Sequence, residues 1–189
     1  MRKSLLIVSI SLCLFSCKGK KNAEKPVDIF PALDFIRSQV AHVDTSVYLI
    51  IKIVKTDSIP DTTYIKRENF KNEAKDFLTI PDVSSNELKN DYVETKLYDA
   101  DLDQVSLSYM PKEKGEITRQ EVLIKPSAQG DKVTSIYVNR TTSSGGTTTQ
   151  KILFWQIDKR FRIVTIIQHN NEPDKTVAVD VVWNDFQAN

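Results

Sequence analysis

Cysteine is nearly missing from this chain of 189 residues, because the two that occur, Cys13 and Cys17, both lie within the first seventeen positions. The remainder of the chain therefore has no disulfide, no thiol nucleophile and no cysteine-ligated metal. A domain built from it is held together by its apolar core alone. About 170 residues are enough for one such core and too few for two comfortable domains.

Glycine and histidine are also scarce: the chain has five glycines and two histidines, His42 and His169. Five glycines leave little material for a phosphate-cradling loop, and neither an HExxH motif nor a nucleophile elbow occurs. A catalytic dyad or a metal site would require the two histidines to meet beside a carboxylate, which nothing in their spacing predicts. We therefore expect no enzymatic activity, no metal and no cofactor.

Neither sign of charge dominates the chain, which has 26 basic and 25 acidic residues. Without Arg2 and Lys3, which precede the first apolar run, 24 basic residues face 25 acidic ones. Nucleic-acid binding requires a net basic face that releases counterions. We therefore expect no nucleic-acid partner.

The N-terminus has the pattern of an export signal. Arg2 and Lys3 precede Leu5–Leu14, an apolar run of ten residues interrupted by two serines. This length suits the hydrophobic region of a signal peptide and is too short to span a bilayer. The following Leu14-Phe15-Ser16-Cys17 resembles the lipobox of bacterial lipoproteins: a leucine, a variable position, a small residue and cysteine. The resemblance implies cleavage of the signal peptide 1–16 and acylation of Cys17, with palmitate among the acyl chains.

An acylated Cys17 would hold the protein on a membrane. Each buried methylene contributes about 0.8 kcal/mol, so two or more acyl chains give a stable anchor. Residues 17–26 are polar and end in Pro26, which predicts a flexible tether before a single domain over 27–189. No acidic residue directly follows Cys17, which favours the periplasmic side of the outer membrane. The alternative is an ordinary cleaved signal peptide that leaves Cys17 near the mature terminus.

Apolar residues recur at steps of three and four from position 33 to position 54. This periodicity predicts one long amphipathic helix over Pro31–Val54, which is the favoured interpretation. The competing interpretation ends the helix near Asp44 and makes Val47–Lys55 a strand, because that segment is rich in β-branched residues.

The segment that follows is predicted as a loop and a second helix. Pro60 and its neighbouring aspartates predict a loop over Lys55–Thr63. Arg67–Leu78 has Phe70 and Phe77 on one face, and Pro81 enforces a stop, so we expect a second helix there.

From position 91 onward the pattern of residues is typical of β-structure. Alternating apolar residues between turn signals predict seven strands, and Gly145-Gly146 predicts a tight hairpin turn. The short connections exclude parallel crossovers, so the sheet is expected to be an antiparallel meander. The predicted class is α+β, with N-terminal helices packed on a curved sheet of about six to seven strands. The predicted strands are Tyr92–Tyr98, Val105–Met110, Ile117–Ile124, Val133–Arg140, Thr147–Ile157, Phe161–Gln168 and Thr176–Trp183.

Alternate carboxylates in Asp99–Asp103 resemble the opening of a calcium-binding loop. The sixth position is Gln104 where such a loop has glycine, and the twelfth is Met110 where it has glutamate. We therefore interpret this segment as a solvated acidic turn and predict no metal site.

Trp155 and Trp183 are the two candidate ligand-binding residues. Both fall in predicted strands among apolar neighbours, so core packing is the first expectation for each. The alternative is that they line a hydrophobic pocket between the sheet and the helices, which would suit a lipid or another apolar ligand.

The hypothesis from the sequence is a lipid-anchored periplasmic envelope protein that acts as a non-enzymatic binding or scaffolding domain. Its expected partners are the membrane, through the anchor, and another envelope protein, because an antiparallel sheet has edges that accept a partner strand. The alternative hypothesis is a carrier or sensor of a lipid or other apolar ligand, held in a pocket between the sheet and the helices.

Overall fold

The computed structural model describes residues 28–56, 59–170 and 172–185. Its elements, in chain order, are α1 (Ala32–Thr45), β1 (Ile50–Lys55), β2 (Asp61–Ile65), the 3₁₀ turn η1 (Arg67–Asn69), α2 (Phe70–Glu73), α3 (Lys75–Leu78), the 3₁₀ turn η2 (Lys89–Asp91), β3 (Tyr92–Asp99), β4 (Gln104–Pro111), β5 (Ile117–Lys125), β6 (Lys132–Ser144), β7 (Thr147–Gln156), β8 (Arg160–His169) and β9 (Lys175–Val182).

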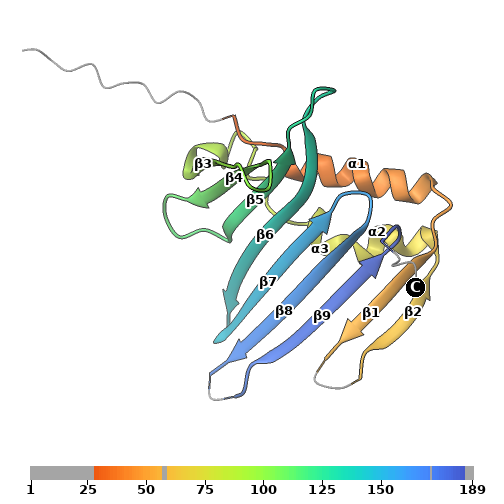
Figure 1. The fold of residues 1–189 in the computed structure, drawn as a ribbon. Helices are drawn as coiled ribbons and strands as arrows, with labels where there is room; N and C mark the ends of the chain where they lie inside the picture. Colours follow the sequence, from red (N-terminus) through yellow and green to blue (C-terminus); the bar gives the residue numbers. More distant parts are fainter. Residues whose placement is uncertain (1–27, 57–58, 171, 186–189) are drawn as a thin grey trace, which may run out of the picture.

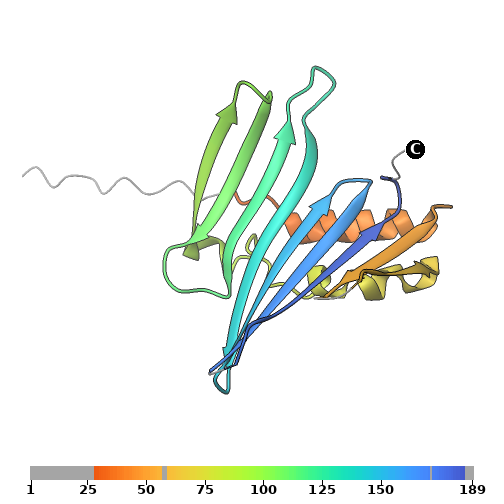
Figure 2. The same ribbon diagram turned by 60° about the horizontal axis from the view of Figure 1, so that its bottom comes forward.

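The described strands form one nine-stranded antiparallel sheet in the order β2-β1-β9-β8-β7-β6-β5-β4-β3. Strands β3 to β9 are a meander, and the β1–β2 hairpin joins it by pairing β1 with β9. The helices cover one face of the sheet, here called the helix face, at the end formed by β1 and β7–β9 (Figure 1). The opposite, uncovered face is called the open face. Strands β3 and β4 extend away from the helices at the other end (Figure 2).

The α+β class and the antiparallel meander agree with the sequence prediction, and all seven predicted strands are present. The sheet is larger than the six to seven strands expected. The additional strands are β1 and β2, which come from the segment predicted as the end of a long helix and a loop. The hairpin was missed because its partner, β9, lies more than a hundred residues further along the chain.

The single helix predicted over Pro31–Val54 is wrong, and the competing interpretation is confirmed. Helix α1 ends at Thr45, where Ser46 takes an extended conformation and its N–H bonds to the carbonyl of Val43 at 3.0 Å. The following Ile50–Lys55 forms β1. Its β-branched side chains are stiff in a helix and pack well on a pleated surface, and β9 supplies the backbone hydrogen-bond partners.

The loop predicted over Lys55–Thr63 is shorter in the structure, because β2 already begins at Asp61. The second helix, predicted over Arg67–Leu78, forms as three short pieces rather than one helix. The break lies at Ala74, whose backbone angles (φ −82°, ψ 3°) leave the α-helical region. Such short pieces have little stability of their own, so their conformation depends on packing against the sheet.

The core between the helices and the sheet is an aromatic cluster. Phe70 and Phe77, from α2 and α3, pack on Trp155 of β7, Phe161 of β8 and Trp183, which directly follows β9. Ring centroids of Phe70 and Trp183, and of Phe77 and Trp155, lie 5.1 Å apart in edge-to-face geometry. All five side chains are at most 1% exposed. Edge-to-face pairs add to the hydrophobic stabilisation of these large side chains.

Helix α1 covers the sheet beside this cluster through a single apolar stripe. Leu33, Ile36, Val40 and Val43 are buried and recur at helical spacing. The preceding segment crosses the helix face, where the backbone N–H of Phe30 donates to the hydroxyl of Tyr109 at 3.1 Å.

The hairpin turn predicted at Gly145-Gly146 is confirmed. The φ angles of the two glycines are +56° and +78°, between paired residues Ser144 and Thr147. A two-residue turn with both φ angles positive matches the twist of the flanking strands, and glycine adopts it without steric cost.

The aromatic cluster yields a stability prediction. We expect Phe77→Ala to lower the free energy of unfolding by about 3–5 kcal/mol, because the phenyl group is fully buried and its removal leaves a cavity. Tyr64→Ala is the control: this side chain is 72% exposed, so the change should stay within about 0.5 kcal/mol. Urea unfolding followed by tryptophan fluorescence measures both. Equal losses in the two variants would contradict the packing described.

Candidate functional site: a cleft at the start of β3

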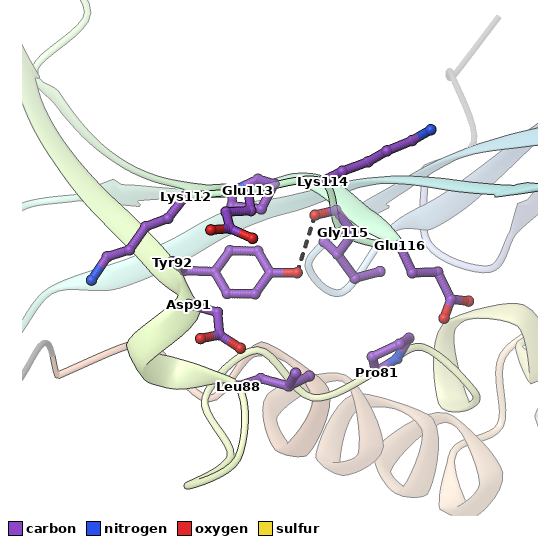
Figure 3. Close-up of a pocket in the computed structure, with 11 residues that line it drawn as sticks. Pro81, Leu88, Asp91, Tyr92, Lys112, Glu113, Lys114, Gly115 and Glu116 are labelled. Carbon is purple, nitrogen blue, oxygen red and sulfur yellow. Dashed lines mark hydrogen bonds between the residues drawn. The ribbon is translucent and has the colours of Figure 1, made fainter.

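A cleft of about 450 Å³ lies where β3 begins and β4 turns into β5 (Figure 3). Three chain segments line it: the loop after α3, the start of β3 and the β4–β5 turn. The apolar part of its wall consists of Pro81, Leu88, Tyr92, Pro111 and Ile117.

Local sequence features bring the β4–β5 turn against the start of β3. Pro111 is the last residue of β4, and the backbone N–H of Lys112 then donates to the carbonyl of Asp91 at 2.7 Å. On the other side of the turn, the carbonyl of Glu116 accepts the N–H of Thr141 at 2.8 Å. The turn is therefore held by backbone bonds at both ends, while its side chains line the cleft.

Tyr92 is the central side chain of the cleft. It is only 4% exposed, and its hydroxyl donates to the carbonyl of Ile117 at 3.1 Å (Figure 3). Burial raises the pKa of Tyr92, and the negative charges of Asp91 and Glu116 raise it further. The phenol is therefore protonated at neutral pH and serves as a hydrogen-bond donor, not as a base.

Three carboxylates surround the Tyr92 side chain: those of Asp91, Glu113 and Glu116 (Figure 3). Glu116 is already paired, with its carboxylate 2.5 Å from the guanidinium of Arg140. The side chains of Lys112 and Lys114 extend away from the ring of Tyr92 in opposite directions (Figure 3). The cleft thus has an apolar wall beside the carboxylates of Asp91 and Glu113, while the ammonium groups of Lys112 and Lys114, which balance these charges in number, point elsewhere. The space beside the two carboxylates suits a cation with an apolar stem.

Gly115 keeps part of this cleft open. A Cβ atom on this residue would lie 3.4 Å from the Cβ of Pro111 and 3.5 Å from the hydroxyl of Tyr92. These are ordinary contact distances, so a small side chain fits without strain, whereas a larger one would occupy the cleft. Gly115 therefore provides a means of blocking the site without altering its charges.

Sequence reasoning missed this cleft. It placed Tyr92 at the start of one predicted strand and residues 111–116 between two others, Val105–Met110 and Ile117–Ile124, without connecting them. The only available signal was a turn carrying alternating charges next to a strand that begins with an aromatic residue. The contribution of the loop containing Leu88 follows from the packing of the chain between α3 and β3, which no local pattern predicts.

The structure places the two candidate ligand-binding tryptophans in the core, as first expected. Trp155 is 0% and Trp183 is 1% exposed, and their ring centroids lie 5.5 Å apart. Phe70, Phe77 and Phe161 occupy the space around them. The two indoles therefore pack on each other and on neighbouring rings instead of lining an open pocket.

The two histidines have separate surroundings. His42 lies in the last turn of α1, with its ring centroid 6.2 Å from that of Tyr48. His169 ends β8, and its Nδ1 lies 2.9 Å from the hydroxyl of Thr147 on the neighbouring strand. The ring contacts given by the structure are thus with a tyrosine and a threonine side chain.

The acidic segment Asp99–Asp103 forms the β3–β4 turn. One carboxylate oxygen of Asp99 accepts the backbone N–H groups of Asp101 and Leu102 at 3.0 and 3.1 Å. Asp103 accepts the hydroxyl of Tyr98 at 2.9 Å and has a positive φ of 47°. These carboxylates thus stabilise the turn. Within the described ranges, no group of three or more histidine, cysteine or acidic residues is arranged to hold a metal ion.

The predicted signal peptide 1–16, the acylation site Cys17 and the tether 17–26 lie outside the described residues. Among the helices of the described part, none has the length and apolar character needed to cross a bilayer.

Comparison of the chain with protein-family models, with curated proteins and with solved structures finds no match.

Proposed function

We propose that this protein is a lipid-anchored periplasmic envelope protein whose domain works as a non-enzymatic binding or scaffolding module. The cleft at the start of β3 is the proposed binding site for a partner protein. The observation that carries this proposal is the wall of the cleft, where apolar side chains adjoin the carboxylates of Asp91 and Glu113.

A lysine side chain of the partner matches this chemistry. Its alkyl stem packs on the apolar wall formed by Leu88 and the two prolines, and its ammonium group approaches the carboxylates. Tyr92 is only 4% exposed, so it forms part of the wall of the site and leaves the contact with the ammonium group to the carboxylates. Hydrogen bonds between ionised partners are stronger than neutral ones, so they account for much of the affinity of such a contact.

The packing of the domain favours this function over the carrier alternative. A carrier requires space for an apolar ligand between the sheet and the helices. In this chain that space holds five aromatic side chains with ring centroids between 5.1 and 6.3 Å apart. Opening it would cost the packing energy that joins the helices to the sheet.

The envelope location is proposed from the leader. The apolar run Leu5–Leu14 and the lipobox-like Leu14-Phe15-Ser16-Cys17 support export and acylation. The polar tether 17–26 would then separate the domain from the membrane surface and leave the cleft accessible to a neighbouring envelope protein.

The cleft proposal predicts selective binding of a basic side chain. The probes are two capped tripeptides, acetyl-Ala-Lys-Ala-amide and the same peptide with norleucine in place of lysine. We expect the lysine peptide to bind with a Kd on the order of 1 mM and the norleucine peptide to bind at least tenfold more weakly, because it lacks the charge. Asp91→Asn and Glu113→Gln should each weaken the lysine peptide roughly tenfold. NMR titration of the protein measures these affinities.

Two further variants test the location of this binding. Gly115→Leu fills the cleft without changing its charge and should abolish binding of the lysine peptide. Asp101→Asn removes a carboxylate from the β3–β4 turn, away from the cleft, and should leave the Kd unchanged. Equal affinity for the two peptides, or equal loss in Asp91→Asn and Asp101→Asn, would exclude the cleft as a site for basic side chains.

The anchor is tested separately with the full chain. Cys17→Ser should remove the acyl mass from the protein and release it from the membrane fraction, because stable anchoring needs the acyl chains. Cys13→Ser, in the apolar run of the leader, is the matched control and should leave both properties unchanged. Intact-mass spectrometry and membrane fractionation provide the two readouts. Acyl mass that persists in Cys17→Ser would contradict the assignment.

A further inference from the structure

Strand β3 is a long sheet edge with few of the features that normally protect an edge. It pairs on one side with β4 over all eight residues in unbroken register, and seven of these residues are exposed. It contains no proline and a single lysine, Lys96. The opposite edge, β2, has only five residues. Unpaired backbone groups along a long, flat edge strand are a template for another strand.

Apolar side chains are concentrated around this edge. On the open face, Val93 (49% exposed) lies opposite Met110 (50%) on β4, and Leu97 (64%) lies further along β3. Tyr98, on the helix face, is 56% exposed. Figure 2 shows β3 along the outer margin of the sheet, away from the helices. A strand added here would therefore cover apolar surface as well as backbone groups.

The sequence of β3 is complementary to itself. In the segment Tyr-Val-Glu-Thr-Lys-Leu-Tyr, residues at equal distances from Thr95 are either both aromatic, both aliphatic or opposite in charge. In an antiparallel pair centred on Thr95, Glu94 lies opposite Lys96 of a second copy, twice by symmetry. Val93 likewise lies opposite Leu97, and Tyr92 opposite Tyr98. Cross-strand pairs of opposite charge and of apolar residues are the ones that stabilise a sheet.

Only this register gives the complementarity. Two identical strands that pair antiparallel are related by a two-fold axis perpendicular to the sheet. Residues that lie opposite each other then have their side chains on the same face of the sheet, so the axis must pass through a residue. Moving the axis to the next residue shifts the register by two positions. The neighbouring registers are centred on Glu94 or on Lys96, and each places two like charges directly opposite. The pairing ends at the tyrosines, because Asp91 belongs to η2 and would otherwise face Asp99 of the second copy.

We propose that two copies of this chain pair antiparallel along β3, centred on Thr95, and join their two sheets into one continuous sheet. The dimer removes the free edge of both copies and brings Val93, Leu97 and Met110 of each into one apolar patch on the open face. The pairing includes Tyr92 at its end but none of the cleft carboxylates, so the substitutions at positions 94, 95 and 96 test the dimer without altering the charges of the cleft.

Cysteine crosslinking of the full chain tests the register. At the two-fold axis the Cα atoms of residue 95 in the two copies lie about 4.5–5.5 Å apart, within the range of a disulfide. Thr95→Cys should therefore give a disulfide-linked dimer when membranes containing the protein are treated with a mild oxidant. Val93→Cys is the matched control: its two copies lie about 13 Å apart in this register and should not link. The unmodified chain controls for Cys17.

Exchange of the two charges tests the complementarity. In the Thr95→Cys background, Lys96→Glu and Glu94→Lys should each weaken self-pairing about tenfold to a hundredfold and remove most of the linked dimer. Co-production of these two variants with different tags should restore a mixed dimer, because each Glu then faces a Lys. This restoration shows that the single variants are folded. Crosslinking at position 93 as efficient as at 95, or charge variants that link undiminished, would overturn the proposal.

Discussion

The aromatic cluster between the helices and the sheet is the interaction on which the rest of the structure depends. One face of the nine-stranded sheet must be covered, and much of the cover comes from α2 and α3, which have four residues each. Such short pieces do not form stably alone. Phe70 and Phe77 hold them by packing on Trp155, Phe161 and Trp183. As a result, the space between these helices and the sheet is filled with side chains.

The position of the cleft follows from that packing. With α3 fixed beneath the β7–β9 end of the sheet, the chain must travel to the far end before β3 begins, and the loop over residues 79–91 makes this crossing. It brings Pro81 and Leu88 beside the β4–β5 turn and so completes the apolar wall around Tyr92. The carboxylates of Asp91 and Glu113 then decide its chemistry, because both are exposed and lie beside that apolar wall.

The β1–β2 hairpin determines which sheet edge is free. By pairing with β9 it covers what would be the last strand of the meander and leaves β3 as the long exposed edge. The cleft and the self-complementary strand therefore lie at the same end of the sheet, because the cleft is at the start of β3. A scaffold that presents a binding cleft next to a dimerisation edge would hold two partner segments in a fixed relation.

The sequence by itself determined the α+β class, the seven strands of the meander and the Gly145-Gly146 turn, because alternation and turn residues act over a few positions. It also determined the chemical symmetry of β3 about Thr95. Only the tertiary structure decided that Ile50–Lys55 is a strand, because helix and strand patterns compete there and pairing with β9 selects between them. The tertiary structure also decided the cleft, because its three segments meet only when the sheet and the aromatic core bring them together.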